Sequence, residues 1–188
     1  MSADPSHVAG LIGSDGKLLA REVAEMAGRP ISNDKAEAID RRSGEIYDRL
    51  NTDPRPLTGA RSLLVALAAS DLDWAIATSS RREQVGVSVK ALRLPSEPHI
   101  IDGSHVEHAK PAPDLLLLAA EKLDLPASKC WYVGDSTWDM RAARAARMAA
   151  LGVPYGAVDA RALRVAGADA VTSLRGIQVD LQRRGLIS

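Results

Sequence analysis

The sequence predicts an α/β fold in which a Rossmann-like parallel sheet follows a small helical lobe. From residue 57 onward, short apolar runs alternate with segments of helical periodicity. Connections of this length between strands make right-handed crossovers, which place consecutive strands parallel. Residues 1–56, in contrast, show helical periodicity and no strand-like run. The chain is therefore expected to divide into a helical lobe, residues 1–56, and an α/β core, residues 57–188.

The helical lobe is expected to contain two helices. Apolar residues recur at helical spacing between Lys17 and Gly28, and Gly28 stands where a stop signal belongs. Asn33 or Asp34 is the expected cap of a second helix, which runs to Leu50.

A turn-rich linker, residues 51–59, leads into the core. The expected core helices are residues 61–70, 82–92, 113–123, 139–147, 160–165 and 174–182. The expected strands are residues 74–78, 99–101, 130–133, 149–153 and 170–171. The first of these strands is almost continuously apolar, as in a strand buried on both faces. Functional residues are expected beyond the carboxyl ends of the strands.

The composition of the 188 residues excludes several classes of protein. Lys+Arg and Asp+Glu both total 24, which argues against a nucleic-acid binder or a membrane-surface protein. No stretch approaches the roughly 18 apolar residues of a membrane helix, and no signal-peptide pattern is visible. A single cysteine, Cys130, excludes an internal disulfide and fits a reducing compartment. We therefore expect a cytoplasmic protein.

Hydroxyl side chains follow the first core strand. A hydroxyl at Thr78 or Ser79, with the backbone N–H groups that follow, is suited to holding a phosphate. The alternative is an ordinary Ser/Thr cap for the next helix.

Lys110 precedes a helix that begins with Pro113. A lysine in this place directs its ammonium at a phosphate or pairs with a carboxylate. The alternative is a solvated loop lysine.

Two aspartates follow the third core strand, after Gly134. Asp135 and Asp139 lie four residues apart around the start of a helix, so both can face one site. Paired carboxylates at a strand end form a site for a hard cation such as Mg²⁺, which neutralises a nearby phosphate. The alternative is that Asp135 or Ser136 caps the helix and Asp139 favours its positive end.

Taken together, these groups resemble the haloacid dehalogenase-like hydrolase superfamily. The order of hydroxyl, lysine and paired aspartates matches its later motifs, and residues 11–19 resemble the cap of its phosphoglycolate phosphatase and β-phosphoglucomutase branch. The quoted motifs are Ile76-Ala-Thr78-Ser79, Lys110-Pro-Ala-Pro-Asp114 and Gly134-Asp135-Ser-Thr-Trp-Asp139. Residues 56–64 look like the return from the cap to the core.

The resemblance implies a phosphatase that acts on a small phosphorylated metabolite through a phospho-aspartyl intermediate. It implies that Thr78 and Lys110 hold the transferring phosphoryl group, that Asp135 binds Mg²⁺, and that Asp139 binds or orients the metal. Ser14 and Lys17, in the cap, are implied substrate contacts.

The sequence departs from the family in one respect. The Asp-x-Asp-x-Thr motif of the opening strand, which supplies the nucleophile and the general acid, is not found. Asp71 and Asp73 have the spacing, but they precede a core strand. We expect about thirty residues, one strand–helix unit, to be lacking, and we expect open sheet edges on either side of the gap.

Two other functions remain possible on the sequence. The first is a non-catalytic protein that binds phosphate or Mg²⁺ without turnover. The second is a receiver-like phosphoacceptor, which the order of the motifs and the cap-like lobe fit poorly.

Overall fold

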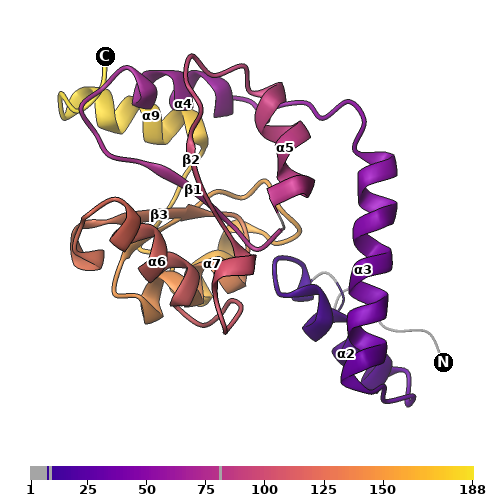
Figure 1. Cartoon of the computed structure of the whole chain (residues 1–188). Coiled ribbons are helices and arrows are strands. Elements are labelled where there is room, and N and C mark those ends of the chain that lie inside the picture. The colour runs from indigo at the N-terminus through magenta and orange to yellow at the C-terminus, as the bar shows by residue number, and fades with distance from the viewer. Residues whose placement is uncertain (1–7, 9, 81) are drawn as a thin grey trace.

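The structure, a computed structural model, describes residues 8, 10–80 and 82–188. Two helices, α2 (Gly16–Met26) and α3 (Asn33–Leu50), pack against each other beside the core (Figure 1). Ser32 caps α3 by accepting a hydrogen bond from the Lys35 N–H, so the predicted cap at Asn33 or Asp34 is wrong. Ser32 still has an extended backbone, whereas Asn33 is already helical, which leaves Ser32 in the capping position.

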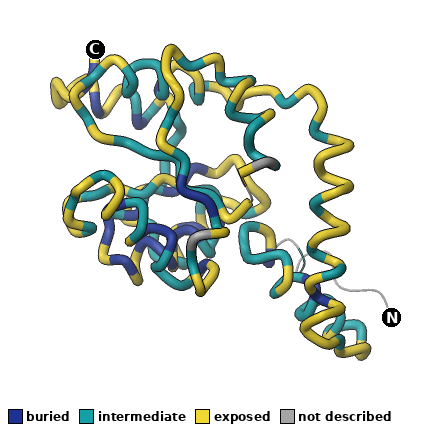
Figure 2. The backbone as a smooth tube through the Cα atoms, in the orientation of Figure 1, coloured by how far each residue is buried: buried dark blue, intermediate teal, exposed yellow. Residues whose placement is uncertain are grey.

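The helical pair buries little of its own surface. Small residues, Ala20 and Ala36, are its buried contacts, and α3 is exposed along most of its length (Figure 2). Asn51 donates a side-chain hydrogen bond to the Ser88 hydroxyl at 3.1 Å, which ties the end of α3 to the core. The predicted boundary at residues 56–57 falls in the segment that follows and remains a prediction.

The core alternates helices and strands as the sequence predicts. Its α-helices are α4 (Ala60–Ala68), α5 (Arg82–Ala91), α6 (Asp114–Lys122), α7 (Thr137–Ala145), α8 (Ala160–Val165) and α9 (Leu174–Arg183). Its strands are β1 (Ala75–Thr78), β2 (His99–Asp102), β3 (Trp131–Gly134), β4 (Ala149–Gly152) and β5 (Ala170–Val171). Two 3-10 turns, η1 (Gly103–His105) and η2 (Ala127–Lys129), complete the described elements.

All described strand pairs are parallel, but they form two separate sheets. β1 pairs with β2, and β3, β4 and β5 form a three-stranded sheet in that order. The α/β fold with parallel strands is confirmed. Among the described residues, β1 and β3 each have one edge without a strand partner. This interruption lies where the sequence predicts open edges.

Two apolar clusters hold the core together. The larger one joins α6, α7, α8 and β4, and its fully buried side chains include Leu115, Leu116, Met140 and Leu163. The smaller one packs α4 against α9. The larger cluster includes residues of α7 and β4, and both elements contact β3. No helix in the described part of the chain is long and apolar enough to cross a membrane.

Candidate functional site

Asp139 is the centre of a buried polar network at the carboxyl end of β3. Ser136 and Asp139 form a capping box at the start of α7: Asp139 N donates to Ser136 Oγ at 3.1 Å, and Ser136 N donates to Asp139 Oδ2 at 3.0 Å. The Ser136 hydroxyl and the Asp135 N–H also donate to Oδ2, at 2.6 and 3.2 Å. Ser136 therefore caps α7, as the alternative interpretation predicts.

Gly134 makes this network possible by its lack of a side chain. A Cβ at this position would lie 2.4 Å from Cβ of Asp139. Any larger residue at the end of β3 would push the Asp139 carboxylate out of the network.

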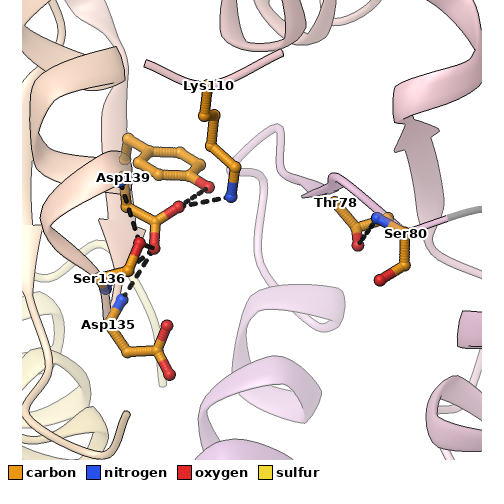
Figure 3. A network of polar contacts seen from close by, with 7 residues as sticks. Thr78, Ser80, Lys110, Asp135, Ser136 and Asp139 are labelled. Atoms are coloured by element: carbon orange, nitrogen blue, oxygen red, sulfur yellow. Dashed lines mark hydrogen bonds and ion pairs between the residues drawn. The ribbon is translucent and has the colours of Figure 1, made fainter. Parts of the chain in front are cut away.

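Lys110 enters the same network from the loop between β2 and α6. Its ammonium donates to Asp139 Oδ1 at 2.7 Å, and the Tyr132 hydroxyl donates to the same oxygen at 3.0 Å (Figure 3). Lys110 is 8% exposed and Asp139 is 4% exposed, so this ion pair is withdrawn from solvent. Lys110 is therefore not a solvated loop lysine.

Electrostatics keep Asp139 ionised. Burial alone would raise the pKa of the Asp139 carboxyl, but the Lys110 charge and hydrogen bonds from Lys110, Ser136 and Tyr132 outweigh burial and lower it. Burial and the charge of Asp139 raise the pKa of the Tyr132 hydroxyl well above its usual value. Tyr132 therefore remains a hydrogen-bond donor.

The Asp135 carboxylate is the open acidic group of the site. Its own backbone N–H donates to it, no other described residue does so, and it points away from the network (Figure 3). Burial and the neighbouring charge of Asp139 raise its pKa, and Lys110 only partly offsets this. A half-buried carboxylate destabilised in this way is suited to a cation.

The residues fit Mg²⁺ in part. Asp135 offers open oxygens, and a Cβ on Gly156 would lie 2.8 Å from Asp135 Oδ2, so Gly156 leaves this carboxylate room. Both oxygens of Asp139, in contrast, are occupied by hydrogen bonds. Within the part of the chain that the structure describes, no group of three or more acidic, His or Cys side chains is placed to hold a metal.

Thr78 stands apart from this network, at the end of β1. Its hydroxyl accepts a hydrogen bond from the Ser80 N–H at 3.1 Å and so closes a local turn; a Ser/Thr cap of α5 remains a prediction. Figure 3 draws no interaction between Thr78 or Ser80 and Lys110. Ser79 is exposed and makes no hydrogen bond through its side chain to a described residue.

Lys17 and Ser14, the two residues of the helical lobe predicted to contact the substrate, differ in position. Lys17 lines a cavity of about 660 Å³ between the helical pair and residues 107–112, and Lys110 and Arg21 line it as well. Ser14 does not line this cavity; its hydroxyl donates to the Leu11 carbonyl at 2.6 Å and closes a turn. A larger and mainly apolar cavity of about 710 Å³, near Pro56 and the C-terminus, is lined by none of the predicted site residues.

Sequence reasoning missed Tyr132 and Trp138. The sequence could have indicated Tyr132, because a tyrosine in a short strand predicted to be buried requires a partner for its hydroxyl. The Trp138 indole N–H donates to the Gly10 carbonyl oxygen at 2.9 Å, across 128 positions of sequence, and no local pattern indicates such a contact.

Known proteins resemble this chain over most of its length. Residues 3–153 match the profile of the haloacid dehalogenase-like hydrolase family. The phosphoglycolate phosphatase of Escherichia coli K12 is 35% identical over 94 residues, which are 50% of this chain and 37% of that enzyme. The chain thus matches less than half the length of this curated relative.

Solved structures show the same fold. A hydrolase from Pseudomonas syringae is 33% identical and superposes with a TM-score of 0.84, covering 94% of this chain and 80% of that one. A hydrolase of the same family from Deinococcus radiodurans, with bound phosphate and sodium, is 25% identical with a TM-score of 0.69, covering 100% of this chain and 84% of that one. The predicted family and its phosphoglycolate phosphatase-like branch are confirmed. With the motif residues in order along the strand ends and the family profile extending from the helical pair through β4, the chain belongs to the haloacid dehalogenase-like hydrolases.

Proposed function

We propose that this chain is part of a Mg²⁺-dependent phosphatase that acts on a small phosphorylated metabolite. The observation that carries the proposal is the buried Lys110–Asp139 pair beside the open carboxylate of Asp135. An ammonium has three donors, and Lys110 uses one on Asp139, which leaves two for an anion. The Escherichia coli relative is named a phosphoglycolate phosphatase, and the Deinococcus radiodurans structure contains bound phosphate. Both support phosphate as the anion.

Each site residue has a proposed role in binding. Lys110 contacts the phosphoryl oxygens, held in place by Asp139. Thr78 and the backbone N–H groups near Ser79 contact the same group from the β1 side. Asp135 holds Mg²⁺, which when bound neutralises phosphate charge. Asp139 acts through Lys110 and the backbone of Asp135 rather than as a direct ligand, because its oxygens are occupied.

The lobe has a role in the same proposal. Residues 1–56 form a cap over a core of residues 57–188. Lys17 contacts the substrate from the wall of the cavity that it shares with Lys110, and Ser14 contributes by shaping the turn before α2. We place the protein in the cytoplasm, because its one cysteine is free.

Phosphoryl transfer in this proposal also requires two further carboxylates. The nucleophile attacks phosphorus, a general acid protonates the leaving oxygen, and water then hydrolyses the acyl phosphate. Asp71 and Asp73 do not fit, since they precede β1 and a four-residue strand of roughly 13 Å separates them from its carboxyl end. We propose that both carboxylates belong to a strand between β1 and β3.

A second function is favoured by one observation, the missing Asp-x-Asp-x-Thr pattern. In this case the chain binds phosphate and Mg²⁺ through Lys110 and Asp135 but performs no turnover.

Thermal unfolding and phosphate release separate the two functions. The chain is heated with Mg²⁺ and inorganic phosphate, and phosphoglycolate hydrolysis by a version extended with the strand proposed between β1 and β3 is followed by the phosphate released. A rise in Tm with turnover supports the phosphatase, and a rise without turnover supports the binding protein. The Asp135→Asn variant should lose the Mg²⁺-dependent rise, whereas Asp124→Asn, a matched change at an exposed turn, should keep it. If the wild-type chain shows neither effect, both functions are wrong.

A further inference from the structure

Trp138 is the second residue of α7, and it connects the core to the segment before α2. Its indole N–H donates to the Gly10 carbonyl oxygen at 2.9 Å, and the Arg141 guanidinium lies over its ring, 5.4 Å from the centroid. The side chain is half-buried and lies between Ser136 and Asp139 in sequence. The hydrogen bond from Trp138 thus joins the helical lobe to α7, the helix that begins at the site.

A close backbone approach accompanies this hydrogen bond. Gly13 has a φ of +95°, and a Cβ there would lie 2.5 Å from Ser136 Oγ and 3.9 Å from the Trp138 ring. The segment of residues 10–14 therefore lies directly on the first turn of α7. Only a glycine permits this contact without displacing Ser136.

Local hydrogen bonds connect this segment to α2. The amide and the hydroxyl of Ser14 both donate to the Leu11 carbonyl, and Leu11 is buried. Asp15 then caps α2 by accepting from the Leu18 N–H. The next turns of α2 carry Lys17 and Arg21, which line the cavity shared with Lys110.

Arg21, on the wall of that cavity, has a polar partner. Its guanidinium donates to the Asn33 side-chain oxygen at 2.9 Å, an amide that orients the charge without neutralising it. The placement of this wall relative to Lys110 depends on how α2 is attached to the core. A further hydrogen bond between the helical pair and the core, from Asn51 to Ser88, is at the far end of α3.

We propose that Trp138 is a positioning residue: its indole N–H holds residues 10–14 on α7 and so fixes the Lys17–Arg21 wall opposite Lys110. Its meaning for catalysis rests on the proposed function, but the contact itself can be tested without turnover. The role is to set the shape of the cavity rather than to touch the reacting group.

Hydrogen exchange followed by mass spectrometry tests the role. Trp138→Phe keeps an aromatic ring beneath Arg141 and removes the N–H donor. Trp131→Phe is the matched control, because Trp131 also lies under an arginine, Arg184 at 5.4 Å, but on β3. Loss of one hydrogen bond should speed exchange in residues 10–19 about two- to tenfold in Trp138→Phe, and leave this region unchanged in the control.

The location of the effect separates positioning from packing. Peptides from α7 should exchange at the wild-type rate in Trp138→Phe. The idea is overturned if α7 accelerates as much as residues 10–19, or if both tryptophan variants accelerate residues 10–19 equally. Should Trp138→Phe fold poorly, Gly13→Ala tests the same contact from the other side, and no change in residues 10–19 there also overturns it.

Binding of Mg²⁺ and phosphate is measured separately, by thermal unfolding of the same two proteins. Wild-type protein and Trp138→Phe are each heated with Mg²⁺ and inorganic phosphate. Because Lys110 and Asp135 are intact, the rise in Tm should persist in the variant. If the Tm of the wild-type protein does not rise, the proposed function is wrong. If hydrogen exchange in residues 10–19 of Trp138→Phe is unchanged, only the positioning role is wrong.

Discussion

The two sides of the site, at the carboxyl ends of β3 and β1, are built very differently. On the β3 side, Asp139 accepts two hydrogen bonds on one oxygen and three on the other, and Lys110 is buried against it. On the β1 side, the Thr78 hydroxyl accepts a single local bond from Ser80. The charges of Lys110 and Asp139 are thus held by the network at the end of β3. The β1 side contributes hydroxyl and backbone groups whose placement that network does not control.

Breaking the β3 network should have the largest effect on stability. Asp139→Asn keeps the shape of the side chain but leaves the Lys110 ammonium buried without its counter-charge. Removing one partner of a buried ion pair costs about 3–5 kcal/mol. Urea unfolding at neutral pH should show a loss of this size, with Asp124→Asn as the exposed control. A loss below about 1 kcal/mol, typical of a surface pair, would contradict the account.

The same substitution should also change the response to acid. The pKa of Asp139 is lowered in the folded state, so its stabilising contribution is present above the unfolded value near 3.8 and is lost as pH falls through the folded value. The difference in free energy of unfolding between wild type and Asp139→Asn should therefore shrink on acidification through this range. A difference that is constant with pH would show that the carboxylate charge is not involved.

Thr78→Val should have a smaller effect on stability. It removes one hydroxyl acceptor and leaves the Ser80 N–H, which is exposed to water, without its partner, so we expect a loss of about 0.5–1 kcal/mol in the same urea titration. The variant should nevertheless bind inorganic phosphate more weakly in the presence of Mg²⁺. If Thr78→Val destabilises the chain as much as Asp139→Asn, the two sides are equally structured and the comparison is wrong.

Local patterns were sufficient to predict the elements of the core. The apolar run that becomes β1 and the periodicity that becomes α7 are complete within ten residues, and their order along the chain implies parallel pairing. The cap of α3 was missed because Ser32, Asn33 and Asp34 are all good capping residues. Only the backbone conformation decides among them, and tertiary packing sets that conformation.

The sequence predicted that these side chains lie at the strand ends, but it did not predict their contacts. Spacing placed Asp135 and Asp139 at one strand end, yet it gave the two carboxylates the same role. The structure distinguishes them, because Lys110 and Tyr132 reach Asp139 from other elements. Contacts between distant segments, such as Trp138 with Gly10, depend on the final packing and leave no periodic signal.

Asp135→Asn distinguishes the two aspartates of the β3 side, because its effect on stability should have the opposite sign to that of Asp139→Asn. Burial and the charge of Asp139 raise the pKa of Asp135, so its ionised form is disfavoured in the folded state. Removing the charge should stabilise the chain at neutral pH by about 0.5 kcal/mol, as is common at functional sites. The gain should disappear as pH falls below the unfolded value near 3.8, since Asp135 is then neutral in both states.

Differential unfolding of Asp135→Asn at neutral and acidic pH checks this sign. The Mg²⁺-dependent rise in Tm should be lost at the same time. A variant that is less stable than wild type at neutral pH would mean that Asp135 is a structural acceptor, not an open ligand.

The smallest effect should come from a second ion pair on the loop that carries Lys110. His108 Nδ1 lies 2.9 Å from Asp114 Oδ2, but both groups are open to water, unlike Lys110 and Asp139. The hydrogen bond to Asp114, with the charge of Asp114, raises the pKa of His108 above 6.5. Any stabilisation is therefore present below 6.5 and is lost as pH rises through the folded value. Asp114→Asn should return the pKa of His108 toward 6.5 in an NMR titration, with little change in Tm, because solvent and salt screen exposed charges. A fall in Tm comparable to that of Asp139→Asn would show that burial is not what makes the Lys110 pair strong.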